Sequence, residues 1–402
     1  MKSPVTYFKK WIKVLLMKEK FLGFERLDGT VGIRNHLLVM SITGLTGPIA
    51  RKISLNLPGS LLIDNPYGSG ILGEDRLRQD RAMIGFGNNP NIGAVLIISG
   101  DPPKTEAIKK GINKTGKIVE TITLEDCNHD SISMFEKGIR LGAKLMLEIS
   151  RKRRRLHHVS NLFVGLECGR SDPSSGMVAN PIMGLIADYL IDLGGSAVIG
   201  ETTEWLGAEH LLVKRAKNNQ VKEEILNAVN FQKNLAISNN VNLLGNNPGY
   251  TNIEAGLSTI EEKSLGNITK SGTKVIQSVI DWGEKPTIDG MHLMHAPAYA
   301  PESLSGFAAA GCQLIFFSTG VGNSFNNHIS PSIKISANPK TCKKLHEQLD
   351  FKCSQVFEGK KTLYHASDEL WEIFIDICSG TRTWGEILSE STEVFSRIGR
   401  SL

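Results

Sequence analysis

The sequence predicts an α/β protein built from two Rossmann-like units with mostly parallel sheets. Short apolar runs rich in Val, Ile and Leu alternate with longer stretches of helical periodicity, a pattern typical of strands buried inside a parallel sheet. A chain of 402 residues exceeds the size at which one hydrophobic core keeps growing, so two domains are expected. We expect an N-terminal extension over residues 1–20, a first α/β domain over 21–155 and a second, larger α/β domain over 156–402.

The first unit is expected to alternate strands and helices from residue 36 onward. Its apolar, β-branched runs predict strands at 36–42, 60–63, 94–99 and 118–124. The stretches between and after them predict helices at 47–55, 73–85, 105–111 and 130–153. This alternation indicates a parallel, doubly wound sheet.

The second unit is expected to carry the larger sheet. Its predicted strands lie at 162–166, 197–200, 291–295, 314–318 and 333–336, and helices follow the second of them to about residue 234. The stretch 239–256 is rich in Asn and Gly and predicts a long loop without an element of its own. Long loops in compact domains are often functional.

Composition and charge narrow the class of protein. Hydrophobic residues make up 41% and charged residues 22%, which is ordinary for a globular protein and argues against disorder. The net charge of +5 would attract acidic substrates. The basic run at 151–155 lacks interleaved aromatic residues, so it indicates a solvated helix end and no nucleic-acid partner is expected.

The cysteines and the N-terminus predict a cytoplasmic protein. The six cysteines are scattered without CxxC spacing, and no secretory signal precedes them, which is typical of a reducing compartment. The apolar stretch at 11–17 is too short to cross a bilayer and lies among lysines. No membrane association is expected.

The segment 167–176, with the letters ECGRSDPSSG, is the strongest candidate for a functional turn. It follows the apolar run 162–166 and precedes a helical stretch, so it gathers a thiol, carboxylates and hydroxyls at the carboxyl end of a strand. Open α/β sheets bind their ligands at this edge. The alternative is an ordinary loop with Ser171 or Ser174 as helix N-cap. Cys168, between a glutamate and a glycine, favours the functional interpretation.

Five motifs occur in order along the chain. They are DGTVGIRN at 28–35, ECGRSD at 167–172, ETTE with GAEH at 201–210, EEKSLG at 261–266, and GVGN at 320–323 with PSIK at 331–334. Together they resemble the altronate and galactarate dehydratase family, which are sugar-acid hydro-lyases, and the resemblance runs from about residue 23 to the C-terminus. It implies dehydration of an altronate- or galactarate-like acid to a 2-keto-3-deoxy acid.

Two cysteines of the family pattern are replaced in this chain. The family has Gly-Cys-Gly and Gly-Cys-Glu turns where this sequence has Ser69 and Asp101, and Arg170 stands in place of a glycine beside the remaining Cys168. The resemblance therefore implies a divalent metal held by Cys168, Ser69 and Asp101. Iron is implied by the family, while manganese and magnesium are alternatives because oxygen ligands suit harder cations.

Apart from Ser69 and Gly70, which belong to the glycine turn at 68–70, the remaining candidate residues come from the matched motifs. An enolate-forming elimination needs a base, an acid and a positive charge. The catalytic candidates are His210, Glu204, Glu209 and Lys334. The candidates for binding the substrate are Arg34, Asn35, Ser69, Gly70, Asn323 and Lys263. Each has a structural alternative: Arg34 would pair with Asp28 or Glu25, His210 would be an ordinary helix histidine, and Lys263 would belong to the capped start of a helix.

Partners follow from the resemblance as well. Family members often carry a small β-rich domain ahead of this region, and some relatives, including sulfolactate sulfo-lyases, place it on a separate subunit. We therefore expect a small acidic substrate, a separate small β-rich subunit and a homo-oligomer. Two alternatives remain: the large subunit of a sulfolactate sulfo-lyase, and a non-catalytic homologue that lost two cysteines of the site.

Overall fold

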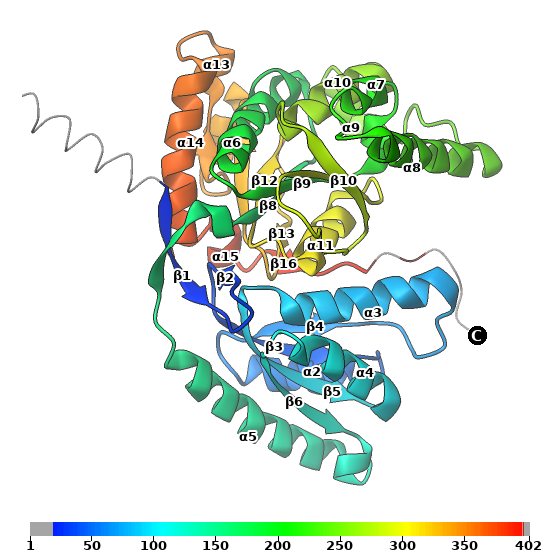
Figure 1. Ribbon diagram of the computed structural model, residues 1–402, viewed down its shortest axis with the longest axis vertical. Helices are drawn as coiled ribbons and strands as arrows, with labels where there is room; N and C mark the ends of the chain where they lie inside the picture. The colour runs from blue at the N-terminus through cyan, green and yellow to red at the C-terminus, as the bar shows by residue number, and fades with distance from the viewer. Residues whose placement is uncertain (1–18, 396, 398–402) are drawn as a thin grey trace, which may run out of the picture.

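Two parallel sheets, one above the other in Figure 1, form the framework of the protein. The computed structural model describes residues 19–395 and 397, so most of the expected N-terminal extension and the apolar stretch 11–17 lie outside the described residues. The expected α/β class is confirmed. None of the described helices is both long and apolar enough to cross a membrane.

The smaller sheet has four parallel strands. Their order is β4 (Leu61–Asp64), β3 (His36–Ser41), β5 (Ile92–Ser99) and β6 (Ile118–Thr123). Helices α2 (Gly47–Leu55) and α5 (Ser131–Ser150) cover one face, and α3 (Gly73–Asn88) and α4 (Pro102–Asn113) cover the other. Apolar side chains alternate between these two cores along β3, as the twofold repeat of a strand requires.

The larger sheet has seven parallel strands. Their order is β10 (Ile276–Asp281), β11 (Met291–His295), β9 (Ser196–Ile199), β8 (Phe163–Cys168), β12 (Leu314–Ser318), β14 (Ser332–Ser336) and β15 (Phe351–Lys352). Helices α6 (Asn180–Asp192) and α14 (Leu363–Cys378) pack on one face, and α11 (Ala300–Ala310) packs on the other.

Further helices and turns complete the two units; η1 follows β6 of the smaller sheet, and the others belong to the part of the chain that forms the larger sheet. They are the π-helical turn η3 (Ser175–Ala179), the 3-10 turns η1 (Glu125–Cys127), η2 (Val159–Asn161), η4 (Thr202–Trp205) and η5 (Thr269–Ser271), and the helices α7 (Glu209–Val213), α8 (Asn219–Ser238), α9 (Tyr250–Glu254), α10 (Ile260–Ile268), α12 (Pro339–Lys344), α13 (Ser354–Phe357) and α15 (Trp384–Ile387). Strands β13 (Asn326–Asn327) and β16 (Ser391–Thr392) form a separate parallel pair.

Helices α3 and α11 join the two sheets. They lie side by side between the layers in Figure 1, and their apolar side chains share one core. The contact requires a glycine at Gly85, because a Cβ there would lie 2.1 Å from the carbonyl oxygen of Ala309. An antiparallel sheet of β1 (Lys20–Glu25), β2 (Val31–Gly32) and β7 (Arg155–His158) makes a second connection beside α14.

Each expected strand has a counterpart, but several elements were not predicted. The expectation of a plain loop over 239–256 was wrong for 250–254, which form α9; its start is stabilised by Asn252 Oδ1, which accepts from the N–H of Gly249 at 3.1 Å. Strand β10 was missed because its sequence, IQSVID, is neither an unbroken apolar run nor a regular alternation, as an edge strand allows. Strand β7 was missed because it follows the basic run and carries few apolar residues.

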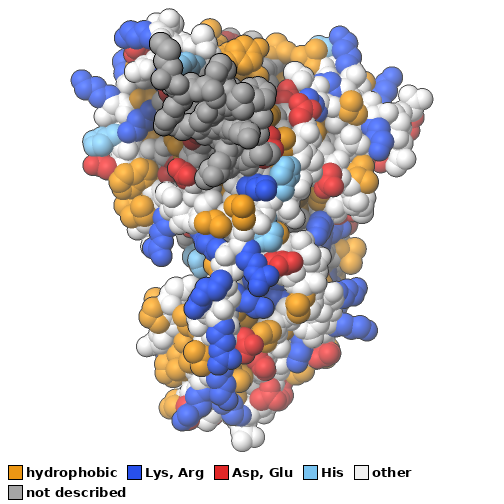
Figure 2. Space-filling view, turned by 60° about the vertical axis from the view of Figure 1, so that its left-hand side comes forward, with side chains coloured by type: hydrophobic (Ala, Val, Ile, Leu, Met, Phe, Trp, Pro, Cys, Tyr) orange, Lys and Arg blue, Asp and Glu red, His pale blue; other side chains and the backbone are white. Residues whose placement is uncertain are grey.

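Part of the basic run at 151–155 has a structural role. The guanidinium of Arg154 donates to the carbonyl oxygens of Leu22 at 2.7 Å and Ile33 at 2.9 Å, and it lies 4.6 Å from the ring centre of Phe24. Its neighbours Arg151, Lys152, Arg153 and Arg155 are exposed. Figure 2 shows Lys and Arg side chains gathered on one face of the lower half of the molecule.

Candidate active site

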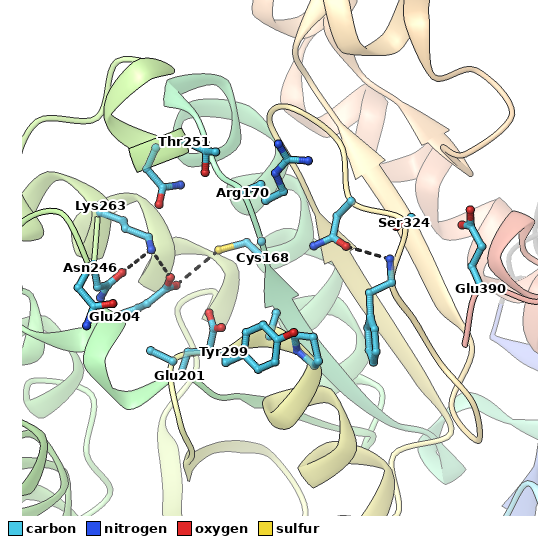
Figure 3. A pocket seen from close by; sticks show the side chains of 18 of the residues that line it. Cys168, Arg170, Glu201, Glu204, Asn246, Thr251, Lys263, Tyr299, Ser324 and Glu390 are labelled. Carbon is cyan, nitrogen blue, oxygen red and sulfur yellow. Dashed lines mark hydrogen bonds and ion pairs between the residues drawn. The ribbon is translucent and has the colours of Figure 1, made fainter. Parts of the chain in front are cut away.

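A cavity of about 650 Å³ opens at the carboxyl edge of the larger sheet (Figure 3). The loops after β8, β9, β11 and β12 supply much of its lining. From β8 the chain continues to β9 on one side, while β12 lies on the other side, so this edge is the switch point at which open α/β sheets bind ligands. The lining includes Cys168, Arg170, Glu201, Glu204, Asn246, Asn247, Lys263, Tyr299, Asn323, Ser324 and Glu390.

Strand β8 ends with two buried acidic groups. The thiol of Cys168 lies 3.0 Å from Asn267 Oδ1, 3.5 Å from Lys270 Nζ and 3.7 Å from Glu204 Oε2. The carboxylate of Glu167 binds Lys270 Nζ at 2.6 Å through Oε1 and accepts from Ser303 Oγ at 2.6 Å through Oε2. Burial raises the pKa of both Glu167 and Cys168 above their ordinary values.

The turn after β9 supplies two further carboxyl groups with opposite pKa shifts. Burial, reinforced by the charge of Glu204, raises the pKa of Glu201 well above its ordinary value. Burial alone would also raise the pKa of Glu204, but the charges of Lys263 and Lys270 outweigh it and lower that pKa. Lys263 Nζ lies 2.7 Å from Glu204 Oε1. Glu201 therefore holds its proton more strongly than an ordinary glutamate and Glu204 ionises more readily, the separation that distinguishes an acid from a base.

The two lysines come from a capped helix and the turn that follows it. Thr259 Oγ1 accepts from the N–H of Glu262 and thereby starts α10, which carries Lys263. Lys270 lies one turn beyond, in η5, and its side chain is fully buried. Although burial lowers the pKa of Lys270, the surrounding acidic groups, Cys168 and Glu167 foremost, raise it above its ordinary value. Lys270 is therefore a permanent buried cation.

Two residues that line the cavity have a left-handed backbone. Arg170 has φ 54° and Glu201 also has φ 54°, a region that residues with a long side chain rarely adopt. Glu201 Oε2 is also buried without a hydrogen-bond partner among residues 19–395 and 397. Strained backbone and unpaired buried polar atoms tend to gather where a protein binds or transforms a ligand. These two observations mark the cavity as the candidate site.

The structure brings together four of the residues predicted from the sequence. Cys168, Glu204, Lys263 and Asn323 all line the cavity, although they come from four different loops and helices. Lys334 lies directly behind its wall. The Lys334 ammonium donates to the carbonyl oxygen of Ser324 at 2.7 Å and pairs with Glu390 Oε2 at 3.2 Å, so it holds two lining residues in place.

Two predicted catalytic residues do not line this cavity. His210 is exposed on the short helix α7, and the neighbouring Glu209 is half-buried. Within the described chain, neither side chain lines the cavity or joins the acidic group around Cys168. Glu201, eight residues earlier than Glu209, lies in the cavity instead.

The predicted metal ligands Ser69 and Asp101 are not brought to Cys168. Both follow strands of the smaller sheet, where Ser69 Oγ donates to Asp101 Oδ2 at 2.5 Å. Asp101 also caps α4 by accepting from the N–H of Lys104 at 3.1 Å. Neither these residues nor Gly70 is among those that line the cavity. The two oxygens belong to a different sheet from the thiol.

Arg34 and Asn35 lie outside the cavity and have structural partners. The Arg34 guanidinium forms a two-pronged ion pair with Glu386, at 2.7 and 2.8 Å, and donates to the carbonyl oxygens of Ile377 and Thr381. Asn35 accepts from Arg26 and donates to the carbonyl oxygen of Ile149. The structural alternative for Arg34 was thus right in kind, but its partner is Glu386 rather than Asp28 or Glu25.

Replacing Arg34 by alanine should lower the free energy of unfolding by about 2–3 kcal/mol, because a buried charged hydrogen-bond network is lost. The substrate KM should stay unchanged, since Arg34 does not line the cavity. Denaturant unfolding and steady-state kinetics measure the two effects. Arg140→Ala, on an exposed face of α5, is the matched control and should change stability by less than about 0.5 kcal/mol. A raised KM with unchanged stability would instead support substrate binding by Arg34.

Several residues of the cavity and its acidic cluster were not predicted. They are Arg170, Glu201, Lys270, Glu167, Asn267, Tyr299 and Glu390. Glu201 stands in a matched motif, and its position two residues beyond a strand was a usable signal. Glu167 and Lys270 are 103 positions apart, and nothing in the local sequence joins them.

A divalent cation has a matching set of donors in this cluster. Ligand atoms of Glu167, Cys168 and Glu204 all lie within 4.8 Å of one another. A thiolate with two carboxylates suits iron or manganese. The Lys270 ammonium contacts two of these three residues, so its charge and a metal ion compete for the same donors. The three side chains are therefore chemically suitable metal ligands. A metal ion binds to them only if it displaces the Lys270 ammonium from these donors.

The α/β fold, with a cavity lined by buried carboxyl groups at the carboxyl edge of a parallel sheet, is typical of an enzyme. Comparison with known proteins agrees with this class. Residues 23–150 match the family described as D-galactarate dehydratase/altronate hydrolase, second domain, and residues 159–401 match D-galactarate/altronate dehydratase, C-terminal. The chain belongs to the D-galactarate/altronate dehydratase family, whose members are lyases.

Three relatives illustrate the range of the family. The (2R)-sulfolactate sulfo-lyase subunit beta of Chromohalobacter salexigens is 36% identical over 95% of this chain and 98% of its own length. Altronate dehydratase of Escherichia coli is 30% identical over 90% of this chain and 74% of its own length. Galactarate dehydratase (L-threo-forming) of Escherichia coli is 26% identical over 90% of this chain and 73% of its own length.

Proposed function

We propose that this chain catalyses the β-elimination of water from an altronate- or galactarate-like sugar acid, a 2-hydroxy acid that carries an anionic group. The observation that supports it best is the pair Glu201 and Glu204, whose pKa values are shifted in opposite directions beside one cavity. Elimination needs a base for the proton at C2 and an acid for the departing hydroxyl at C3.

Glu204 is the proposed base. Its ionised carboxylate takes the C2 proton, and the C2 electron pair forms the double bond to C3. The positive charges of Lys263 and Lys270 lie beside Glu204 and Cys168, so an enolate that forms next to this base would be stabilised more than the substrate.

Glu201 is the proposed acid. Its proton passes to the C3 hydroxyl, the C3–O bond breaks, and water leaves together with the bond's electron pair. Glu201 Oε2 has no hydrogen-bond partner in the described chain, so this oxygen is available to the C3 hydroxyl of the substrate. The enol then loses the proton of its C2 hydroxyl and takes up a proton at C3 to give the 2-keto-3-deoxy acid, so the reaction consumes no external oxidant or reductant.

We also propose a divalent metal, iron in the first place, at Cys168 with Glu167 and Glu204. When bound, such an ion supplies positive charge to the enolate. A separate small subunit is part of the same proposal, supported by the name "subunit beta" of the Chromohalobacter relative, which this chain matches over 98% of that relative's length.

The same match favours a second candidate function, the removal of sulfite from (2R)-sulfolactate. This reaction differs from the dehydration only in its leaving group. C2 loses its proton, the C3–S bond breaks, and sulfite departs with the electron pair of that bond. The residues proposed for the base and for the enolate are the same.

The test is a keto-acid release assay with (2R)-sulfolactate, altronate and galactarate, on protein purified anaerobically with any small subunit encoded beside it. We expect turnover of one substrate class, and sulfite release distinguishes the second function from the first. Elemental analysis of the same sample tests the metal. Absence of keto acid from every substrate would contradict both functions and favour a non-catalytic homologue.

A further inference from the structure

Arg170 occupies an unusual position for an arginine. It lies two residues after Cys168, in the turn that follows β8, and its backbone has φ 54°. Glycine adopts this conformation freely, whereas an arginine side chain is disfavoured there. Loops that follow strands accept glycine readily, so a long cation at this point needs a compensating function.

The turn that contains Arg170 is held in place by the loop that follows β12. The carbonyl oxygen of Arg170 accepts from the N–H groups of Gly320 and Val321, at 3.2 and 3.3 Å. The side chain donates from Nη1 to the carbonyl oxygen of Gly322 at 3.1 Å. These contacts join the loops after β8 and β12 and direct the guanidinium to the cavity, where Figure 3 shows it on the far side of Cys168 from Tyr299.

The charge of Arg170 is not compensated by the protein. Among residues 19–395 and 397, no carboxylate lies within 4.0 Å of this guanidinium. The other cation of the cavity lining, Lys263, is paired with Glu204. A guanidinium has several N–H donors, and a single carbonyl bond leaves most of them free for a ligand.

The cations at the Cys168 end of the cavity are already engaged by acidic groups of the protein. Lys263 pairs with Glu204, and Lys270 binds Glu167 and contacts Cys168. A substrate that reacts at this end and carries a second anionic group must place that group elsewhere. Arg170 is the free cation of the described cavity lining.

We propose that Arg170 is a specificity-determining residue that binds the second anionic group of a dianionic 2-hydroxy acid, either a sulfonate or a distal carboxylate. The inference rests on the proposed function and adds the substrate's charge to it. Both groups present oxygen pairs that match the fork of a guanidinium. A sulfonate at this point would be the leaving group, whereas a distal carboxylate would only anchor the chain.

The test compares Arg170→Gly, Arg170→Lys and wild-type protein, each purified with its small subunit where one exists. Galactarate serves as the dicarboxylate, (2R)-sulfolactate as the sulfonate, and altronate as a monoanion of the same carbon number as galactarate. Calorimetric Kd values are measured beside kcat/KM, so that binding is read even where turnover is slow.

We expect Arg170→Gly to weaken at least one dianion by about 10- to 100-fold and altronate by less than about 3-fold. The lysine variant should recover part of the loss, because it keeps the charge and loses the fork. The arm that loses most identifies the group bound: a drop in kcat with sulfolactate indicates a leaving sulfonate, and a rise in KM with galactarate indicates an anchoring carboxylate.

Thermal unfolding supplies an independent readout. Arg170→Gly should unfold at a temperature equal to or a degree or two above wild type, because the glycine relieves the left-handed backbone. Asn128→Gly is the matched control, since Asn128 has φ 49° and lies in the smaller sheet's domain, away from the cavity. It should change neither Kd nor specificity.

Two outcomes would overturn the assignment. One is a dianion preference that survives in Arg170→Gly, and the other is an equal loss for altronate and for the dianions. If wild-type protein binds and turns over none of the three acids, the proposed function fails as well. Turnover by wild type with an unchanged preference in the variant would reject the role of Arg170 alone.

Discussion

Glu204→Gln should reduce kcat by about 10²- to 10⁴-fold, the range by which a positioned general base accelerates a reaction. Glutamine has nearly the same shape as glutamate and still accepts from Lys263, but it cannot take a proton. The KM should change far less, because the lost interaction serves the transition state rather than substrate binding. Steady-state kinetics on the substrate identified by the panel measure both quantities.

The pH profile gives this prediction a second readout. Lys263 and Lys270 outweigh burial and hold the pKa of Glu204 below its ordinary value, so the base is ionised throughout the neutral range. On the acidic side, wild-type activity should therefore be lost as the pH falls through that lowered pKa. The variant should lack this acidic limb.

Glu223→Gln is the matched control, since Glu223 is exposed on α8. It should retain wild-type kcat. A Glu204→Gln protein that is folded and keeps more than a third of wild-type kcat would exclude Glu204 as the base. Attention would then turn to Cys168, which lies 3.7 Å from Glu204 Oε2.

Most of the fold could be predicted because the central strands of both sheets are buried on both faces. Such strands appear as unbroken apolar runs: β5 is fully apolar apart from Gly93 and Ser99, and β12 has four apolar residues in succession. Strand β1 could not be predicted in the same way, because its pairing with β7 joins segments more than a hundred residues apart. Such pairing leaves no local pattern.

The site was predicted where a motif lies at a strand end, and missed where burial joins distant residues. Cys168 ends β8, and this position alone pointed to the cavity. Arg34 was assigned to substrate because its partner Glu386 lies 352 positions away. Ser69 and Asp101 occupy strand ends too, but of the other sheet, and sequence order does not tell which edges meet.

Lys270→Met should lower the free energy of unfolding by about 3–5 kcal/mol, the usual effect of breaking a buried ion pair from one side. The side chains of Lys270 and Glu167 are both fully buried, at a separation of 2.6 Å. Removing the ammonium leaves Glu167 with Ser303 as its remaining side-chain donor, so its charge is no longer balanced. Denaturant unfolding measures the change, and kcat should fall with it because the enolate loses a cation.

Two further variants test the cause. Lys222→Met removes a lysine from the exposed face of α8 and should change stability by less than about 0.5 kcal/mol. The double variant Glu167→Gln with Lys270→Met removes both charges, so it should recover part of the stability lost in the single variant. Equal stability of Lys270→Met and wild type would show that the pair does not contribute to the fold.

The same variant decides how the metal and the lysine share their ligands. The ammonium of Lys270 contacts Glu167 and Cys168, two of the three residues that can hold a cation. A metal ion at these donors and the Lys270 ammonium would both be positively charged, and like charges repel strongly in a buried site. If a divalent ion binds at these donors, folded Lys270→Met protein should bind iron or manganese more tightly, by about tenfold or more. Unchanged metal affinity would show that the metal binds elsewhere. Lys270 would then be the cation that stabilises the enolate at this site.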